Sequence, residues 1–221
     1  MTKLERSLVI IKPDGTVRRR IGALVIKALM NRNLKVIAFK EMNVPESLAK
    51  LHYDVHKDKP FFPWLVDFIS SAPVITMILE GENAIEAIRD ALGATFVQKA
   101  DPSSLRGKYG VWAGINIAHA SDAPDTAKKE ILLWKKEGGL EERDDAQEMA
   151  LEYVKKYSTN ENDYTTEIRN TVKTAIEKED TSEDVLQRLI DLLSKDAADI
   201  TEEEINKLAR VVFDYIKEEV E

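Results

Sequence analysis

Apolar and polar positions along residues 1–140 follow two different periods. Short apolar or alternating runs are typical of buried or half-buried strands, and four occur: residues 7–12, 34–40, 73–79 and 114–119. Between them, apolar residues recur at helical spacing over residues 21–30, 45–56, 61–69, 83–92 and 124–136. The order of these elements predicts an α+β fold, a ferredoxin-like βαββαβ sandwich with an antiparallel sheet.

Local signals indicate where these elements begin and end. Pro13, Asp14 and Gly15 predict a turn after the first strand. Residues 93–110 contain few periodic apolar positions and predict a long loop, and such loops in compact domains are usually functional. Residues 121–124 (SDAP) combine a capping side chain with an early proline, which predicts a helix start.

Residues 141–221 show no strand pattern and four amphipathic helical stripes. The stripes lie within residues 146–157, 164–176, 185–193 and 205–216. Thr201 and Glu204 have the spacing of a capping box, and Thr181 with Asp184 approximates it. We therefore predict an all-α C-terminal extension.

Charge divides the chain at the same place. The 221 residues have a net charge of -8, but residues 1–140 hold 21 basic and 16 acidic side chains, a net of +5. Residues 141–221 hold 11 basic and 24 acidic side chains, a net of -13. With a Gly138-Gly139 pair at the change, we predict one domain over residues 1–140 and an acidic helical extension over residues 141–221.

Composition excludes several classes of function. The chain has no cysteine, which excludes disulfides and thiol nucleophiles. Its longest stretch without a charged side chain is 13 residues, whereas a membrane-spanning helix needs about 20. The first six residues carry three charges and no apolar core, so we expect no export signal and a cytoplasmic location. The acidic balance argues against dedicated nucleic-acid binding, and we expect no membrane binding.

Histidine is the residue type on which the chemistry depends. His52 and His56 have the i, i+4 spacing of metal ligands, but the HExxH pattern is missing and no third ligand is obviously placed, which favours an ordinary structural role. His119 ends a predicted strand just before a predicted helix start, a common place for reactive groups. Its spacing alone leaves a catalytic and a structural role equally open.

Phosphate chemistry is indicated by the residues around these elements. A phosphate site needs cations and N–H or O–H donors that converge on one point. The candidates are Lys12 at a strand end, Arg89 on a helix, and Thr95 and Arg106 in the long loop. The GxxxxGK[ST] pattern is missing, so a phosphate grip here is not of the P-loop type.

Ordered motifs between about residues 4 and 136 resemble the nucleoside diphosphate kinase family. Residues 116–122 (NIAHASD) resemble its NxxHGSD active-site motif, with Glu130 at the expected place on the next helix. The other matching blocks are residues 9–14 (VIIKPD), 52–53 (HY), 59–62 (KPFF), 79–84 (LEGENA), 93–95 (GAT) and 105–107 (LRG).

The resemblance implies a role for each matching residue. His119 would be the nucleophile that takes the γ-phosphoryl group of ATP and passes it to a nucleoside diphosphate, with Ser121 and Glu130 orienting its imidazole. Histidine, with an unperturbed pKa of about 6.5, suits such a reaction near neutral pH. The nucleotide would be bound by Lys12, Tyr53, Arg89, Thr95 and Arg106 at the phosphates, Lys12 and Asn116 at the sugar, and Phe61 stacked on the base.

The resemblance also implies a partner ion and an assembly. Mg²⁺ would arrive with the nucleotide phosphates, without dedicated protein ligands, and the chain would form a homo-oligomer, commonly a tetramer or hexamer. The alternative function is a nucleotide-binding scaffold or regulatory protein that presents the helical extension to a partner. In either case we expect the extension to be dispensable for chemistry and to serve assembly or partner contact.

Three departures from the family pattern stand out. Ala120 replaces the glycine that usually follows the histidine, and would cost about 1 kcal/mol if the position needed a positive φ. Phe96 and Val97 follow the GAT block where Asn-Pro is usual. Arg19 and Arg20 replace the usual glycine and hydrophobic residue.

Overall fold

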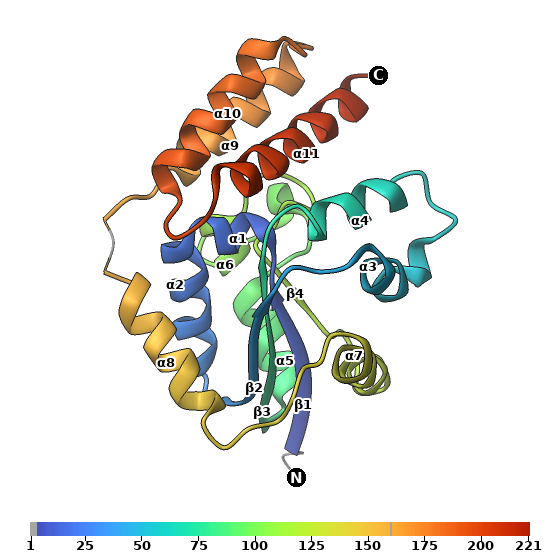
Figure 1. The fold of residues 1–221 in the computed structure, drawn as a ribbon, viewed down its shortest axis with the longest axis vertical. Helices are drawn as coiled ribbons and strands as arrows, with labels where there is room; N and C mark the ends of the chain where they lie inside the picture. The colour runs from blue at the N-terminus through green and yellow to red at the C-terminus, as the bar shows by residue number, and fades with distance from the viewer. Residues whose placement is uncertain (1–3, 160) are drawn as a thin grey trace.

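A four-stranded antiparallel sheet forms the centre of the molecule. In this computed structural model, which describes residues 4–159 and 161–221, the strands lie in the order β2-β3-β1-β4 (Figure 1). Their bounds are β1 Leu4–Ile11, β2 Lys35–Met42, β3 Val74–Glu82 and β4 Ala118–Ala120. All neighbouring pairs are antiparallel, so the predicted ferredoxin-like α+β sandwich is confirmed.

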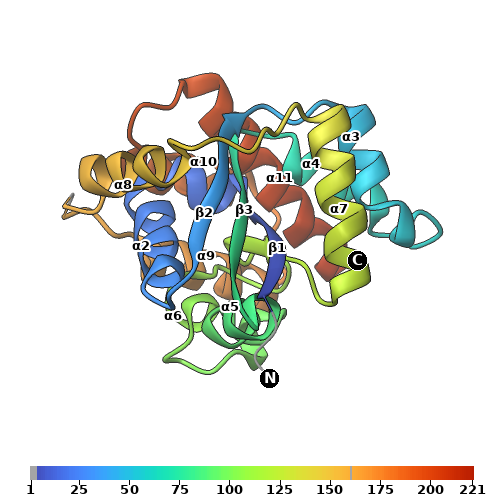
Figure 2. The ribbon, with the colours of Figure 1, turned by 90° about the horizontal axis from the view of Figure 1, so that it is seen from below.

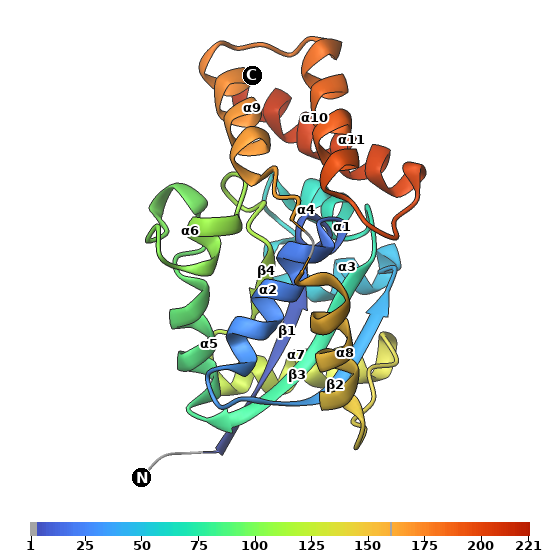
Figure 3. The same cartoon turned by 90° about the vertical axis from the view of Figure 1, so that its left-hand side faces the viewer.

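Helices cover both faces of the sheet, because alternate strand residues point to opposite sides. Val9 and Ile11 face a core with α2 (Arg19–Met30), α5 (Ala84–Leu92) and α8 (Ala146–Tyr157), seen in front of the sheet in Figure 3. Leu8 and Ile10 face the opposite core with α3 (Glu46–His52), α4 (Phe62–Ile69) and α7 (Pro124–Glu137). Figure 2 shows the sheet between these two layers.

The structure differs from the sequence prediction in three segments. The predicted turn at residues 13–15 is the start of helix α1 (Pro13–Val17), because a proline in the first turn is already held at a helical φ. The predicted loop 93–110 contains the short helices η2 (Val97–Lys99) and α6 (Leu105–Tyr109). The fourth strand is shorter than predicted, because Ala113 (φ 42°) and Ile117 (φ 67°) interrupt the extended backbone before it.

Helix caps agree with the sequence at one of three positions. The capping box of Thr201 and Glu204 at the start of α11 (Glu202–Val220) is confirmed. Helix α7 begins at Pro124, as the early proline predicted, but its N-cap is Ala123 without a side-chain cap, and the oxygen of Ser121 accepts from the amide of Leu8 instead. Helix α10 (Glu183–Asp196) begins after Ser182, so its cap lies one residue beyond the predicted one.

The C-terminal helices pack on the domain that precedes them in the chain. Helices α9 (Thr165–Glu177), α10 and α11 lie above the end of the sheet where β1 runs into α1 (Figures 1 and 3). They share one apolar core with Val17, Phe68 and Val111 of the preceding domain. The indole nitrogen of Trp64 donates to the carbonyl oxygen of Val211 in α11 at 2.9 Å. The extension is thus continuous with the domain it follows.

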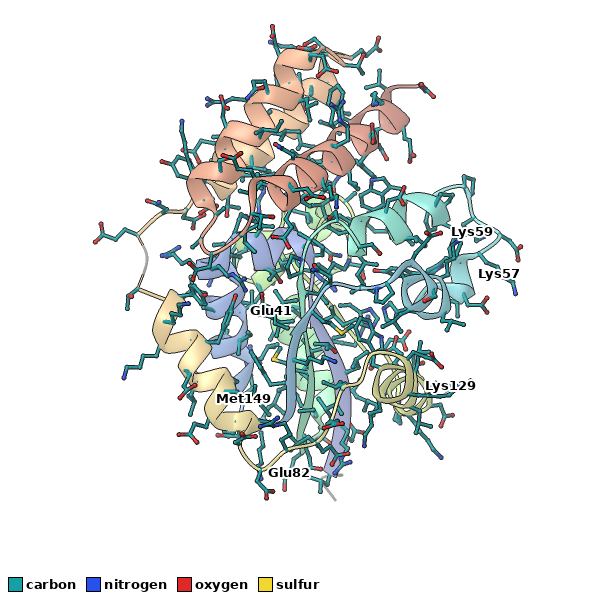
Figure 4. The ribbon with its side chains drawn as sticks, in the orientation of Figure 1. Glu41, Lys57, Lys59, Glu82, Lys129 and Met149 are labelled. Atoms are coloured by element: carbon teal, nitrogen blue, oxygen red, sulfur yellow. The ribbon has the colours of Figure 1, made fainter. Side chains whose placement is uncertain are left out.

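Helix α8 and the segment before it protect the edge of the sheet. β2 is an edge strand, and unpaired backbone groups at such an edge readily pair with another chain. The amide of Arg143 donates to the carbonyl oxygen of Ile37 at 3.0 Å, and the amide of Val36 donates to the side chain of Gln147 at 2.7 Å. Met149, labelled in Figure 4, packs partly buried on the core beneath α8.

Arg19 and Arg20, which depart from the family pattern, both contact the extension. Arg19 forms a two-bond ion pair with Glu41 (2.8 and 2.7 Å; Figure 4) and donates to the carbonyl oxygen of Ala198 at 3.2 Å. Arg20 pairs with Asp163 at 3.2 Å. These substitutions therefore supply the cations that hold the additional helices.

None of the described helices is both long enough and apolar enough to cross a membrane.

Truncating Leu208 to alanine should destabilise both parts of the chain together. Leu208 is fully buried in the core that α11 shares with Trp64, so the change should cost about 2–5 kcal/mol of unfolding free energy. Trp134 lies in the core of the first domain and Trp64 at its contact with α11, so fluorescence follows that domain and this contact, while circular dichroism follows all helices. Both probes should shift equally in denaturant. The half-exposed Leu151→Ala should change little, and a shift of the dichroism alone in L208A would show independent folding.

Candidate active site

His119 lies on the middle residue of β4. It pairs directly opposite Ile10 of β1, and opposite residues of an antiparallel pair point to the same face. That face is covered by α3 and α7, and the His119 side chain is 23% exposed. The imidazole is therefore held between helices while one part of it stays open to solvent.

A carboxylate orients the imidazole from α7. Oε1 of Glu130 lies 2.9 Å from Nε2 of His119, a distance that meets the limit for an ion pair although the angle is not that of a hydrogen bond. Its other oxygen accepts a hydrogen bond from the Ser121 hydroxyl at 2.6 Å, and the Ser121 oxygen accepts from the amide of Leu8 at 3.1 Å. With Nε2 turned to Glu130, Nδ1 is the ring nitrogen left for attack.

His52 is a site residue for which the sequence favoured an ordinary structural role. Its ring lies 4.6 Å from that of His119, edge to face, and its Nδ1 accepts from the Trp134 indole at 3.2 Å. Burial, with the nearby His119 and Lys12, lowers the pKa of His52 well below its ordinary value, so it is neutral at physiological pH. His52, which packs against the ring of His119, leaves its Nε2 without a hydrogen-bond partner in the described part of the chain.

The described residues bring three metal-ligand types together at this point. His52, His119 and Glu130 each offer an atom within 4.8 Å of the others, whereas His56 is not part of the group. Two imidazoles and a carboxylate suit zinc better than magnesium, which prefers oxygen ligands. A metal ion there would take lone pairs of His119 itself.

Two buried cations stand beside the histidine. The ammonium of Lys12 donates to Asn116 Oδ1 (2.9 Å) and to the carbonyl oxygen of Gly114 (3.2 Å); burial, with Arg106 nearby, lowers the pKa of Lys12 to about 8. Burial also lowers the pKa of Arg106 to about 10, and the charge of Arg89 adds to this. Cations whose charge is disfavoured in this way bind an incoming phosphate more strongly.

Most remaining predicted site residues lie around these groups. The side chain of Asn116 donates to the carbonyl oxygen of Thr95 at 2.7 Å, which places the exposed Thr95 at the rim. The ring of Tyr53 lies 4.8 Å from that of His52; burial, with the charge of Glu130 nearby, raises the pKa of its phenol.

Phe61 stands apart from this cluster. Its ring contacts that of His56 at 5.7 Å and is 45% exposed, just before α4. Figure 4 labels Lys57 and Lys59 on the same segment.

The backbone before His119 is strained, and buried charges hold it. Ile117 has a φ of 67°, a conformation that costs a β-branched residue about 1–2 kcal/mol. The carboxylate of Asp14 accepts from the amide of Ile117 at 2.9 Å. The carbonyl oxygen of Ile117 accepts from the amide of Lys12 at 2.8 Å. Asp14 is itself supported by the fully buried Arg18, 3.8 Å away. No motif or periodic pattern in the sequence predicts this buried pair.

The alanine after the histidine is not strained. Ala120 is a strand residue of β4 and pairs with Val9, in extended backbone that any residue adopts. Ala120 therefore does not carry the cost that a left-handed backbone conformation would impose on it.

A histidine with a carboxylate behind it and buried cations beside it, on a ferredoxin-like sheet, is the arrangement of an enzyme that handles phosphate. A model of the family described as nucleoside diphosphate kinase matches residues 5–139. The chain belongs to this family, and is a nucleotide-binding kinase with additional helices α8–α11 beyond the matched residues. The family resemblance and the kinase assignment made from the sequence are confirmed.

Relatives and solved structures agree with this assignment. A nucleoside diphosphate kinase of Methanothermobacter thermautotrophicus is 47% identical over 131 residues, 59% of this chain and 87% of the relative. One of Synechocystis is 45% identical over 141 residues, 64% of this chain and 94% of the relative. The structure of a Halobacterium salinarum nucleoside diphosphate kinase in complex with CDP is similar at a TM-score of 0.58 and 41% identity, covering 67% of this chain and 99% of that one.

The depressed pKa of Lys12 should appear in the pH profile of kcat/KM. In the free enzyme Lys12 loses its proton above about pH 8, so nucleotide capture should weaken there, while bound phosphate keeps Lys12 charged and kcat should stay level to higher pH. Lys12→Arg should lose this alkaline decline, because guanidinium stays charged. A wild-type kcat/KM that stays level to pH 10 would contradict this role.

Proposed function

We propose that this enzyme transfers the γ-phosphoryl group of ATP to nucleoside diphosphates in two steps through phosphohistidine on His119. Nδ1 of His119 attacks the γ-phosphorus, the bond to the β–γ bridging oxygen breaks, and ADP leaves. The terminal phosphate oxygen of a nucleoside diphosphate then attacks the same phosphorus, which frees the histidine. The observation that carries the proposal is the Glu130 contact at Nε2, because it leaves Nδ1 as the nucleophilic nitrogen.

Charge on the transferred group is stabilised by Lys12, Arg89 and Arg106, with Thr95 and the Tyr53 hydroxyl as further donors. Phosphoryl transfer depends mainly on positioning and charge stabilisation, and no strong base is required. Buried cations supply this better than exposed ones, because little water has to reorganise as the charge moves.

The rest of the nucleotide lies toward the outside of the site. We propose that Lys12 and Asn116 bind the sugar hydroxyls and that the exposed ring of Phe61 stacks on the base. Stacking uses the flat face that all bases share, so it supports acceptance of many nucleotides.

Magnesium enters this reaction with the nucleotide. The donor set that the described residues bring together contains two histidines, which does not favour Mg²⁺, so the fit is to an ion carried by the phosphates. When bound with the nucleotide, the ion would offset the negative charge of the phosphates.

The C-terminal extension limits which surface of the protein another subunit can contact. We propose that the protein is a cytoplasmic homo-oligomer, as the family resemblance implies, with contacts elsewhere than the outer edge of β2, which residues 142–147 occupy. The alternative, a scaffold that presents the extension, is less well supported, because the apolar stripes of its helices face inward.

Replacing His119 with alanine should abolish the phosphoenzyme. Wild-type protein incubated with γ-labelled ATP should carry an acid-labile, base-stable label, and His119→Ala should carry none, because it lacks the nucleophile. His56→Ala is the matched control and should label normally. Label that persists on pure H119A protein would place the nucleophile at another residue.

Phe61→Ala should raise KM for purine and pyrimidine diphosphates to a similar extent. Loss of stacking costs about 1–3 kcal/mol per base, or roughly 5- to 150-fold in affinity. The exposed Leu132→Ala on α7 is the control for removal of a surface apolar side chain. An effect confined to one base would replace stacking with specific recognition.

A further inference from the structure

The helix that carries Arg106 is too short to be stable by itself. α6 spans Leu105–Tyr109, five residues, and a helix of that length gains almost nothing from its own hydrogen bonds. The last carbonyl groups of any helix also lack partners within the helix. The groups that satisfy those carbonyls therefore help to fix the backbone of Arg106, whose guanidinium also binds the carbonyl oxygen of Gly93.

Arg169 of the extension binds most of these carbonyls. Its Nη2 donates to the carbonyl oxygens of Gly107 at 2.9 Å and Lys108 at 3.3 Å, and its Nε donates to that of Gly110 at 3.0 Å. A positively charged guanidinium group at the C-terminal end of a helix also complements the helix dipole. Figure 3 shows α6 beneath the lower end of α9, from which Arg169 reaches it.

A second arginine, Arg18, binds the carbonyl oxygen of α6 that Arg169 does not reach, and α9 holds Arg18 in turn. The fully buried Arg18 donates from Nη2 to the carbonyl oxygen of Tyr109 at 2.9 Å and from Nη1 to the hydroxyl of Thr165 at 2.8 Å. Thr165 and Arg169 are four residues apart, on one face of α9. One turn of this helix thus fixes the carbonyls of residues 107–110.

Apolar packing supports the same contact. Ile168 and Val172 of α9 are buried in one core with Val111 and Ile115 of the segment between α6 and β4. The apolar contacts thus hold α9 against this segment, while the hydrogen bonds of Arg169 beside them are mostly part-buried.

Arg106 and Arg18 are both connected to the backbone beside His119. Arg106 donates from Nη2 to the carbonyl oxygen of Ala118 at 2.8 Å. Arg18 donates from Nε to the carbonyl oxygen of Asp14 at 2.6 Å, and the carboxylate of Asp14 holds the amide of Ile117. Two chains of contacts run from α9 and meet at residues 117 and 118.

We propose that α9 is a built-in part of the phosphate site, in which Arg169 and Thr165 are positioning residues for Arg106 and for the strand of His119. The proposal rests on the proposed function, since it concerns the same reaction. It replaces the expectation that the extension is dispensable for chemistry. Neither residue touches the nucleotide; each acts through Arg106 or Arg18.

Single and double variants of the full-length protein test this. Arg169→Ala should lower kcat/KM about tenfold or more, because a displaced Arg106 no longer meets the phosphate. Arg188→Ala, an exposed arginine on α10, is the matched control and should leave kcat/KM within about twofold. In the Arg106→Ala background, R169A should change kcat/KM less than about twofold, because the residue through which it acts is gone.

The same cycle separates positioning from general stability. A purely structural effect would lower kcat/KM by the same factor in both backgrounds, and that result would overturn the proposal, as would full activity of R169A. If R169A does not fold, Arg169→Lys carries the cycle, because it keeps the charge but reaches fewer carbonyl oxygens of α6.

Failure of this proposal is distinguishable from failure of the proposed function. Labelling with γ-labelled ATP is run on wild type, H119A and R169A together. An unlabelled wild type overturns the phosphohistidine route. A labelled wild type with an R169A protein that labels and turns over at the wild-type rate overturns only the role of α9.

Discussion

The short strand β4 is the element on which the rest of the site depends. It has three residues, too few to hold a catalytic side chain by their own ladder, and His119 is the middle one. Its position is fixed by groups around it: β1 pairs with it, Arg106 binds the carbonyl of Ala118, and Asp14 holds the strained Ile117 just before it. Strain of this kind persists only where the surroundings over-determine the backbone. The histidine is therefore placed by tertiary contacts, and its orientation by Glu130.

The same burial that fixes the site makes its charges unfavourable until substrate binds. Lys12 and Arg106 both have lowered pKa values because they are buried among other cations. In the function that we propose, a nucleotide phosphate supplies the missing negative charge, so that binding energy and charge stabilisation come from one arrangement. The neutral, buried His52 fits this picture, since a second cation beside His119 would add further repulsion.

The helices of the extension have two structural effects on the preceding domain. Residues before and within α8 cover the edge of β2, which an isolated domain would expose to pairing with other chains. Helices α9–α11 bury an apolar surface over α1 and α4, and α9 satisfies the carbonyls of α6. The arginines that depart from the family pattern, Arg19 and Arg20, contact the segments after α10 and before α9, respectively. Their substitution and the presence of the extension thus have one physical explanation.

The sequence by itself determined the order of strands and helices, the helical character of residues 141–221 and the family, because periodicity and ordered motifs are local properties. It also named His119, Ser121 and Glu130, whose spacing lies within one strand–helix unit. Only the tertiary structure decided which ring nitrogen of His119 is free, that Asp14 and Arg18 form a buried support, and that Arg169 reaches α6. Those facts depend on residues far apart in the chain, and no periodic pattern records which carbonyl an arginine will find. Ser121 shows the same limit: its segment predicted a helix start with a capping side chain, but the fold makes the Ser121 oxygen accept from the Leu8 amide while its O–H donates to Glu130 at 2.6 Å.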